Sequence, residues 1–315
     1  MSAITTQKVV VEDTFGIEGA RFEVNGYAPN HTQQLFVPAL DSDYAYRKDV
    51  ASTLLLWWEK EVNPLWLWGP MGSGKSSALT QMAARLNIPC QIVTCHDELQ
   101  TPDLVGRYVP NGEGGFDFVD GPLLTAMRYG QLLILDEIDY LSPATAAGLN
   151  GLREGQPLTV PETGEVIRPA PGFRLAVTSN TNGSGDEYGI YSGTNRMNQA
   201  FMDGFVGLEI GYPEKEVEVA LLEKTMPGLD KRLLETMVDI ANAIRGAFMG
   251  NPQNQGEEAI DITMSTRTLL RWGKWRLWAN KNPEAWTYSM ERALTWRASE
   301  HAKAFIHGII EREIV

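Results

Sequence analysis

Three groups of polar residues in this sequence have the types and spacing needed to bind and cleave a nucleoside triphosphate. The first is GPMGSGKS at residues 69–76, which fits the pattern G-x-x-x-x-G-K-[ST]. The second is the acidic pair Asp136 and Glu137, and the third is Asn180. Each group follows a short apolar run, and parallel α/β sheets bind ligands at the carboxyl ends of their strands. The sequence therefore predicts one site built where three strands end.

The phosphate-loop pattern assigns a physical task to each of its parts. Glycines let backbone N–H groups point inward as an anion nest, and the helix that begins near Lys75 adds its positive end. Lys75 is expected to reach the β- and γ-phosphates, and the Ser76 hydroxyl is expected to join the shell of Mg²⁺. The alternative is a glycine-rich turn without a ligand, which matches by chance in about 1% of chains this long. The predicted nucleotide-binding residues are Gly69, Pro70, Met71, Gly72, Ser73, Gly74, Lys75, Ser76 and Ser77.

The two acids and the asparagine are the candidates for chemistry on the bound phosphate. Asp136 ends the run LLIL and is expected to hold Mg²⁺ together with Ser76. Glu137 is expected to polarise the attacking water as a general base. The alternative is a buried strand followed by a solvated acidic turn. Asn180 follows a further apolar strand and is expected to orient the same water, while its alternative role is to cap the next turn.

The elements that must position these residues are indicated by apolar runs and helical patterns. Residues 65–68, 132–135, 173–179 and 206–210 are typical of buried strands. Four or five parallel strands with helices between them predict a doubly wound α/β domain of about 165 residues. After residue 213 helical patterns dominate, with helices expected at 266–281 and from about 283 to 314. The predicted parts are a lead-in segment at 1–45, an α/β domain at 46–213 and a helical domain at 214–315.

Composition limits the classes of function that this chain could have. Lys and Arg number 27 and Asp and Glu number 40, and the net charge of −13 disfavours a broad affinity for nucleic acid. A signal peptide and an apolar run near 18 residues are both absent, which predicts no membrane span. Two cysteines in 315 residues suit a reducing cytoplasm, so we expect a cytoplasmic location. The four histidines form no metal-ligand pattern.

The run RWGKWRLWANK at residues 271–281 mixes tryptophans with cations. Such a pattern could stack on single-stranded nucleic acid. The alternative, favoured by the acidic charge of the chain, is that the tryptophans fill the core of the helical domain while the cations stay at its edge.

The residues described so far resemble those of AAA+ ATPases of the MoxR branch. The likeness rests on GPMGSGKS, LLILDEID, LAVTSN and two insertions at 103–130 and 157–174, each with two short strands around a turn. The chain is most similar to the CobS-type ATPase subunits of aerobic cobaltochelatase, through FGIEGARFEV, VIRPAPGFRL and IYSGTNRMNQAFMD. This similarity covers roughly residues 13–215 and is weak beyond them. It implies a doubly wound AAA+ sheet with two β-hairpin insertions, followed by an all-α lid.

The resemblance also implies a function, cofactors and partners. It implies a Mg²⁺-dependent ATPase that forms rings, commonly hexamers, with ATP between subunits. A protein partner with a von Willebrand A-type domain and the remodelling of a target complex are expected as well. Within this reading, the role is that of a cobaltochelatase motor or of a related motor outside cobalamin synthesis. The alternatives from other classes are a nucleic-acid motor and an interaction module that binds nucleotide without hydrolysing it.

The resemblance assigns an arginine of the lid to the γ-phosphate. Arg267 in STRTLLRW falls at that place, and Arg271 is the runner-up. The alternative for Arg267 is an exposed arginine near a helix start, with its charge in water.

The sequence departs from the family at a second arginine. The family usually has Asp-Arg-[Phe/Trp] before the last strand, and that arginine reaches the ATP of the neighbouring subunit. Here residues 202–205 read MDGF, so Gly204 stands at the arginine position. The nearest substitute is Arg196, which lies about two turns from Gly204 if a helix begins after Ser192 or Thr194. The alternatives are that Arg196 is an ordinary surface residue, or that hydrolysis is slow.

Overall fold

The computed structural model describes residues 5–60, 63–185, 191, 193–248 and 260–314. The chain divides into two compact units, which are Met1–Pro70 with Lys75–Ile210, and Gly211–Val315 with the loop residues Met71–Gly74. The sequence pattern predicts a division after residue 213, and the structure has it after Ile210. Residues 1–45, predicted to be a separate lead-in segment, belong to the first unit. Lys75, Asp136 and Asn180 all lie in the first unit.

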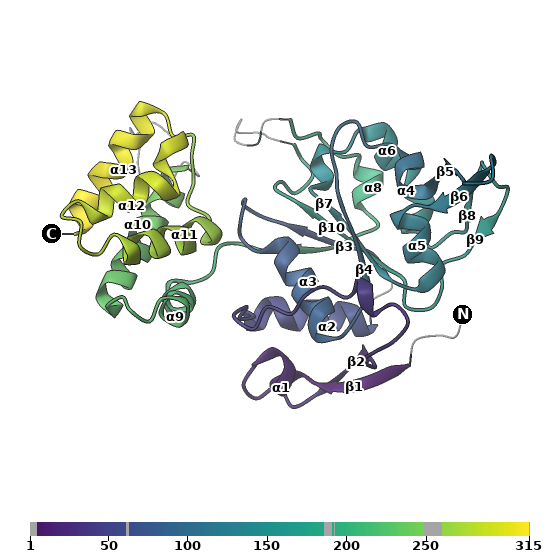
Figure 1. Ribbon diagram of the computed structural model, residues 1–315, viewed down its shortest axis with the longest axis horizontal. Helices are drawn as coiled ribbons and strands as arrows, with labels where there is room; N and C mark the ends of the chain where they lie inside the picture. The colour runs from purple at the N-terminus through teal and green to yellow at the C-terminus, as the bar shows by residue number, and fades with distance from the viewer. Residues whose placement is uncertain (1–4, 61–62, 186–190, 192, 249–259, 315) are drawn as a thin grey trace. The chain divides into compact units, whose positions relative to one another are not determined.

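A parallel sheet of five strands forms the centre of the first unit, in the order β11-β3-β10-β7-β4 (Figure 1). Its strands are β3 (Leu65–Trp68), β4 (Cys90–Thr94), β7 (Leu132–Asp136), β10 (Arg174–Ser179) and β11 (Val206–Glu209). Successive side chains point to opposite faces, and both faces are covered, which explains the unbroken apolar runs. The predicted doubly wound α/β fold is therefore confirmed.

Helices cover both faces of this sheet. On one face, Leu65, Leu67 and Ile134 share a core with α2 (Lys48–Lys60) and α3 (Lys75–Arg85). On the other face, alternate residues of the same strands, such as Trp66 and Leu133, share a second core with five shorter helices. These helices are α4 (Thr101–Val105), α5 (Pro122–Tyr129), α6 (Pro143–Gly148), α7 (Asn150–Arg153) and α8 (Gln199–Met202). The sheet is thus the middle layer of three.

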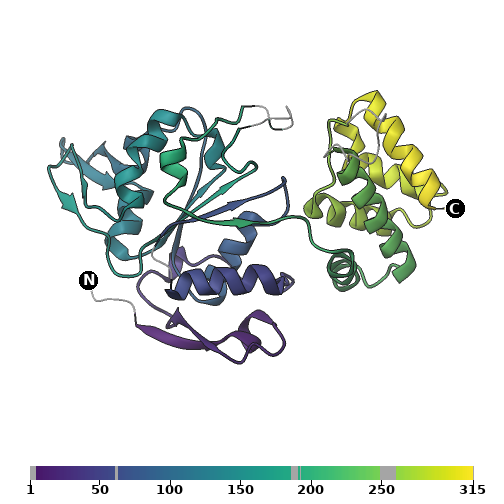
Figure 2. The same ribbon diagram turned by 180° about the vertical axis from the view of Figure 1, so that it is seen from behind.

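The amino-terminal segment packs on the first of these cores. It contains the antiparallel strands β1 (Thr6–Val10) and β2 (Glu23–Tyr27), the short helix α1 (Val11–Phe15) and the 3-10 turn η1 (Gln34–Phe36). Both views show this hairpin beside α2 (Figures 1 and 2). Val11, Phe15 and Val24 are buried in the core that α2 and α3 share. The indole N–H of Trp58 donates to the carbonyl of Asn25 at 2.7 Å, which fastens the hairpin to α2.

The two expected β-hairpin insertions are present at one end of the first unit. They are β5 (Gly106–Pro110) with β6 (Phe116–Asp120), and β8 (Leu158–Thr159) with β9 (Val166–Ile167). Arg128 on α5 pairs with Asp120 at 2.6 Å and with Glu165 at 2.5 Å, so one guanidinium joins both hairpins to a helix. The Tyr108 hydroxyl also donates to the carbonyl of Glu162 at 2.9 Å. These contacts hold the hairpins together as one projecting block.

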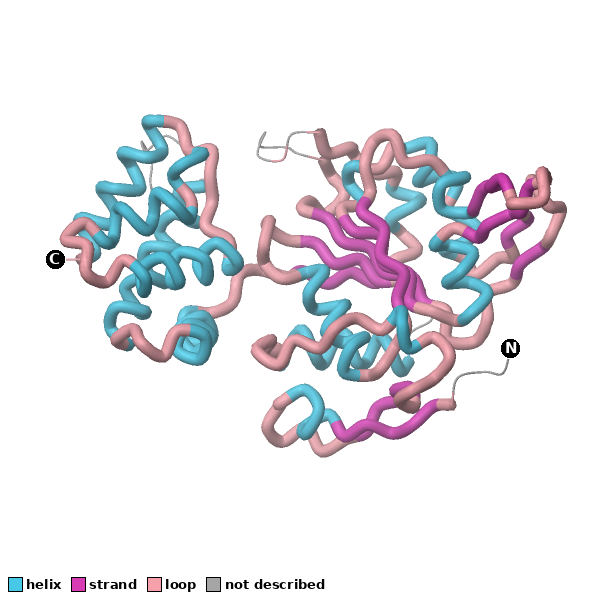
Figure 3. Tube along the Cα trace, viewed as in Figure 1, coloured by secondary structure: helices cyan, strands magenta, loops and turns pink. Residues whose placement is uncertain are grey.

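The second unit consists of helices and loops within the described residues (Figure 3). Its helices are α9 (Lys215–Thr225), α10 (Lys231–Phe248), α11 (Thr266–Trp278), α12 (Ala285–Ala293), η3 (Thr295–Arg297) and α13 (Glu300–Glu313). The predicted all-α character of this part is confirmed. The single helix predicted from about 283 to 314 is wrong, because the chain breaks after α12 and Ser299 caps a new helix, its hydroxyl accepting from the amide of Ala302 at 3.2 Å.

The tryptophan-rich helix α11 fits neither of its two predicted readings completely. Trp272 is fully buried and donates its indole N–H to Ser289 at 2.9 Å, as expected of a core residue. Arg276 is also buried and lies over the ring of Trp286 at 5.2 Å, instead of staying at the edge. Trp278, in contrast, is 68% exposed. The helix therefore buries one face in the core and leaves one tryptophan in solvent.

Two expectations from composition concern membranes and cysteines. Among the described residues, no helix combines the length and the apolar character needed to cross a bilayer. Cys90 and Cys95 are buried free thiols, and burial raises the pKa of Cys95 to about 12. The thiol of Cys95 therefore stays protonated at neutral pH.

A buried ion pair organises the second unit and supports a stability prediction. Glu218 is 1% exposed and accepts two bonds from Arg245, at 2.6 and 2.9 Å, and one from Thr266 at 2.7 Å. Removing one partner of a buried pair leaves an uncompensated charge. We expect Glu218→Ala to lower the free energy of unfolding of this unit by about 3–5 kcal/mol.

Urea unfolding followed by tryptophan fluorescence would measure this loss. The control is Asp239→Ala, which breaks the half-exposed pair with Lys215 and should cost at most about 1 kcal/mol. Equal losses in the two variants would contradict a special role for the Glu218–Arg245 pair.

Candidate active site

The phosphate loop connects β3 to α3 at the carboxyl end of the sheet. Gly69 has a φ of 145°, and a Cβ atom there would lie 2.2 Å from the carbonyl oxygen of Ile210. Ile210 is held in that place by its own amide, which donates to Trp68 at 2.7 Å. Only glycine fits this conformation and this close approach. The helix α3 begins at Lys75, so its positive end faces the loop.

Lys75 is buried beneath the loop, with 8% of its surface exposed. Its ammonium donates to the carbonyls of Gly69 at 2.8 Å and Pro70 at 3.0 Å, and to the side-chain oxygen of Asn180 at 3.0 Å. The predicted loop lysine and the predicted asparagine are therefore in direct contact. This contact follows from the sheet order, because β3 and β10 are neighbours.

The charge of Lys75 is poorly solvated in this place. Burial lowers the pKa of its ammonium to about 8, and the nearby carboxylates of Asp139, Asp136 and Glu137 oppose that change. A triphosphate bound in the loop would supply further negative charge at the ammonium. The poorly solvated charge of Lys75 therefore favours the binding of an anion at this site.

Asp136, at the end of β7, accepts hydrogen bonds from two hydroxyl groups. The Ser76 hydroxyl donates to its carboxylate at 2.5 Å, and the Thr178 hydroxyl donates to the same oxygen. Thr178 also accepts the backbone N–H of Glu137 at 3.1 Å. The structure therefore brings Ser76 and Asp136 together, as the sequence pattern predicts. It adds Thr178, which sequence reasoning missed because a threonine inside a strand is an ordinary strand residue.

Glu137 lies on the surface beside this cluster, in an uncommon backbone conformation. Its φ of 59° and ψ of 46° are left-handed, which is rare outside glycine. This turn lets Asp136 face Ser76 while the Glu137 side chain remains exposed. Partial burial and the charge of Asp136 raise the pKa of Glu137. A carboxylate with a raised pKa is a stronger base, which suits proton abstraction from water.

Asp139 is a further acid of the site that sequence reasoning missed. It is fully buried in the 3-10 turn η2 (Ile138–Tyr140), and one carboxylate oxygen accepts the amides of Asn180 at 2.9 Å and Thr181 at 3.2 Å. Its other oxygen has no hydrogen-bond partner among the described residues. Burial raises the pKa of this carboxyl, and the two amides oppose that change. Asp139 thereby ties the turn after β7 to the end of β10.

The donor set around Asp136 is composed of oxygens. Carboxylate and hydroxyl oxygens from Asp136, Ser76 and Thr178 are the kind of donors that Mg²⁺ prefers. They fit a small hard cation that also keeps waters and phosphate oxygens. Neither here nor elsewhere in the described residues do three or more His, Cys, Asp or Glu side chains form a group that could hold a metal ion.

The helix that was expected to carry Arg196 toward Gly204 does not begin where the sequence pattern places it. Residues 194–198 are not helical, and α8 begins at Gln199 after the cap Asn198. Two backbone bonds hold the preceding stretch in place, from Asn195 to Asp139 at 2.6 Å and from Met197 to Gly183 at 2.9 Å. Arg196 is exposed in this stretch, so the helical premise for its role is wrong.

The two lid arginines are exposed on α11. Arg267 lies in the first turn of that helix and Arg271 one turn later. Both belong to the second unit, and their assignment to the γ-phosphate remains a prediction.

Comparison with known protein families finds two matches along the chain. Residues 64–203 match the AAA domain of the dynein-related subfamily. Residues 218–312 match the CbbQ/NirQ/NorQ C-terminal domain. The first match contains the whole cluster around Lys75 and Asp136, and the second corresponds to the helical unit.

Individual relatives agree with these matches. The aerobic cobaltochelatase subunit CobS of Sinorhizobium sp is 30% identical over 283 residues, which cover 87% of this chain and 82% of the relative. Protein NorQ of Paracoccus denitrificans is 36% identical over 186 residues, covering 58% of this chain and 65% of the relative. The denitrification regulatory protein NirQ of Stutzerimonas stutzeri is 32% identical over 209 residues, covering 66% and 70%.

Proposed function

This chain belongs to the MoxR-type AAA+ ATPases, which makes it an ATP hydrolase, and we propose that it acts as a ring-forming motor that remodels a partner complex. The observation that carries the proposal is the cluster at the carboxyl ends of β3, β7 and β10. It joins a buried lysine, an acid hydrogen-bonded to the loop serine, an exposed acid and an asparagine. These are the parts required to bind a triphosphate and direct water onto it.

We assign the following roles within this site. Lys75 and the loop amides bind the β- and γ-phosphates, and Asn180 orients the attacking water. Glu137 accepts the proton from that water. Ser76 and Asp136 would hold Mg²⁺, which neutralises phosphate charge when it is bound.

The assembly is proposed to be a ring, with six subunits as the expected number. ATP bound to one subunit would then face a neighbouring copy. A ring requires a head-to-tail interface between two different surfaces of the chain. The partner is proposed to be a protein with a von Willebrand A-type domain, and the cytoplasm is the proposed location.

Two kinds of target complex are supported by the similarities of this chain. Similarity to CobS over most of both chains supports a cobaltochelatase-type motor, in which cobalt would be cargo handled by another subunit. The match of the helical unit to the CbbQ/NirQ/NorQ C-terminal domain supports a related ATPase that serves a different complex.

ATP turnover per subunit should rise with protein concentration and then saturate, with Mg²⁺ present and no partner added. The reason is that a site completed by a neighbour is active only in the assembled state, and an arginine supplied in trans is worth about 10³-fold or more. Phosphate release measured across a dilution series, with sedimentation on the same samples, would test this. A rate per subunit that stays at background at every concentration would contradict completion of the site by a second copy.

A further inference from the structure

In the first unit, the guanidinium of Arg153 lies in the space that a side chain at position 204 would fill. A Cβ atom at Gly204 would lie 2.4 Å from Nη1, 2.5 Å from Cδ and 2.6 Å from Cζ of Arg153. Gly204 does not have a positive φ in the described chain, so its backbone gives no reason for glycine. The missing side chain at 204 is instead what allows the guanidinium of Arg153 to lie there. Where the family pattern has an arginine, this chain therefore has an arginine that comes from another element.

The guanidinium of Arg153 is held at the end of the short helix α8. Its Nη1 donates to the carbonyls of Ala200 at 2.7 Å and Phe201 at 3.1 Å, and its Nη2 donates to Glu154 at 2.9 Å. The Arg153 side chain is 12% exposed, and its Nε is buried without a partner among the described residues. Glu154 is 51% exposed, and an exposed ion pair of this kind is weak. Arg153 is thus positioned, but its charge is not fully compensated.

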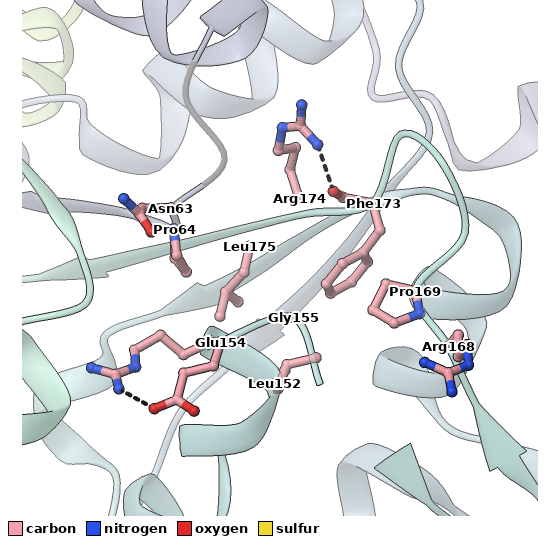
Figure 4. Close-up of a pocket in the computed structure, with 11 residues that line it drawn as sticks. Asn63, Pro64, Leu152, Glu154, Gly155, Arg168, Pro169, Phe173, Arg174 and Leu175 are labelled. Carbon is pink, nitrogen blue, oxygen red and sulfur yellow. Dashed lines mark hydrogen bonds and ion pairs between the residues drawn. The ribbon is translucent and has the colours of Figure 1, made fainter. Parts of the chain in front are cut away.

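A cavity of about 430 Å³ lies beside this arginine. Leu175 and Phe173 point into it from the start of β10, while Arg174 extends the other way, toward the ring of Trp58 (Figure 4). The exposed Arg168 also lines the cavity. The space therefore has an apolar floor, and the cations Arg153 and Arg168 outnumber the single acid Glu154 among the groups at its edge, in a chain whose net charge is −13. A negatively charged group is the ligand that such an edge favours.

The cavity lies at the opposite edge of the sheet from the phosphate loop. It is lined by Pro64, Arg174 and Leu175, at the amino ends of β3 and β10, whereas the Lys75–Asn180 contact is at their carboxyl ends. The length of β10 separates the two edges by about 16 Å. The guanidinium of Arg153 therefore lies too far away to serve the ATP bound by its own chain. Any triphosphate that it contacts belongs to a second copy.

We propose that Arg153 is the arginine that acts in trans, contacting the terminal phosphate of ATP bound to a neighbouring copy, with Arg168 adding positive charge beside it. This inference rests on the proposed ring-forming ATPase. A guanidinium binds phosphate oxygens through its N–H groups. In Arg153, Nη1 donates to the two carbonyls of α8, so Nη2, which is held only by the exposed Glu154, is the group that would turn to a phosphate oxygen. The swap of an arginine at 204 for one at 153 keeps the charge of the family pattern and changes the element that delivers it.

The first test is the substitution Arg153→Ala. We expect turnover at saturating protein and ATP to fall at least about 100-fold, while ATP affinity per subunit changes little, because the contact forms on the neighbour's phosphate. Arg153→Lys should recover only part of the loss, since a lysine lacks the planar fork. The matched control is Arg232→Ala, an exposed arginine of the second unit, which should leave turnover unchanged. Normal turnover in Arg153→Ala together with a large loss in Arg196→Ala would return the role to Arg196.

Arg153 also binds carbonyls of α8, so a second test separates catalysis from structure. Copies with Glu137→Gln keep Arg153 but lack the base, and copies with Arg153→Ala keep the base. Each should be nearly inactive alone, and an equal mixture should recover about one quarter of wild-type turnover, since a head-to-tail interface pairs each site with one neighbour at random. A mixture as inactive as its components would overturn the proposal.

A third variant tests the exchange of positions directly. The double variant Arg153→Ala with Gly204→Arg should regain turnover well above that of Arg153→Ala. An unchanged rate would count against a shared role for the two positions. Wild-type protein that fails to bind or cleave ATP would refute the proposed function itself, whereas concentration-dependent wild-type turnover with a fully active Arg153→Ala would refute only the assignment to Arg153.

Discussion

Replacing Glu137 with Gln should leave ATP bound but uncleaved. The expected loss of turnover is about 10²–10⁴-fold, the range for removal of a general base, while the dissociation constant for ATP stays near the wild-type value. Glutamine keeps the shape of the side chain, and the contact to Thr178 is made by the backbone N–H, so it survives the change. Partial burial and, after it, the charge of Asp136 raise the pKa of Glu137, which makes its carboxylate a stronger base. The neutral amide of glutamine cannot act as this base.

Phosphate release and equilibrium ATP binding, measured on the same preparation, would check this prediction. Glu113→Gln is the matched control, because Glu113 is an exposed glutamate near the tip of the β5–β6 hairpin, outside the cluster. Its turnover should equal that of the wild type. Retained hydrolysis in Glu137→Gln would show that another carboxylate of this strand end, Asp136 or Asp139, acts as the base.

The phosphate-binding half of the site could be predicted because its determinants are local. A loop between a buried strand and a helix is encoded in consecutive residues around Lys75, and Asp136 ends its own apolar strand. Parallel strands then bring their carboxyl ends to one edge without further information. Asn180 contacts Lys75 for this reason, although the two residues are far apart in sequence.

Other residues could not be predicted because their roles arise from tertiary contacts. Asp139 has no distinctive spacing, and only the fold shows that it holds the amides of Asn180 and Thr181. No motif in the sequence marks Arg153, and its contact with Gly204 joins two segments that the sequence does not relate. The helix start expected before Arg196 is wrong because helix boundaries depend on caps such as Asn198, which end or start a helix within a few residues.

Replacing Lys75 with Met should abolish nucleotide binding without unfolding the protein. The ammonium is the one buried cation that contacts both the loop and Asn180 in the described chain, so its loss should raise the dissociation constant for ATP at least about 100-fold. The nucleotide-free variant should keep a thermal midpoint within about 3 °C of the wild type. Burial of a charged ammonium is unfavourable, as the lowering of the pKa of Lys75 to about 8 indicates. Methionine carries no charge, so this cost disappears and offsets the loss of three hydrogen bonds.

Thermal unfolding with and without ATP separates these two effects in one experiment. A ligand that binds only the folded state raises the midpoint according to its concentration relative to the dissociation constant. Wild-type protein and the control Lys60→Met, at an exposed lysine of α2, should both show that rise. Lys75→Met should start near the same midpoint and show no rise. An ATP-dependent rise equal to that of the wild type would refute the assignment of this loop to the triphosphate, whereas a strongly lowered starting midpoint would mean that the lysine holds the loop together even without a nucleotide.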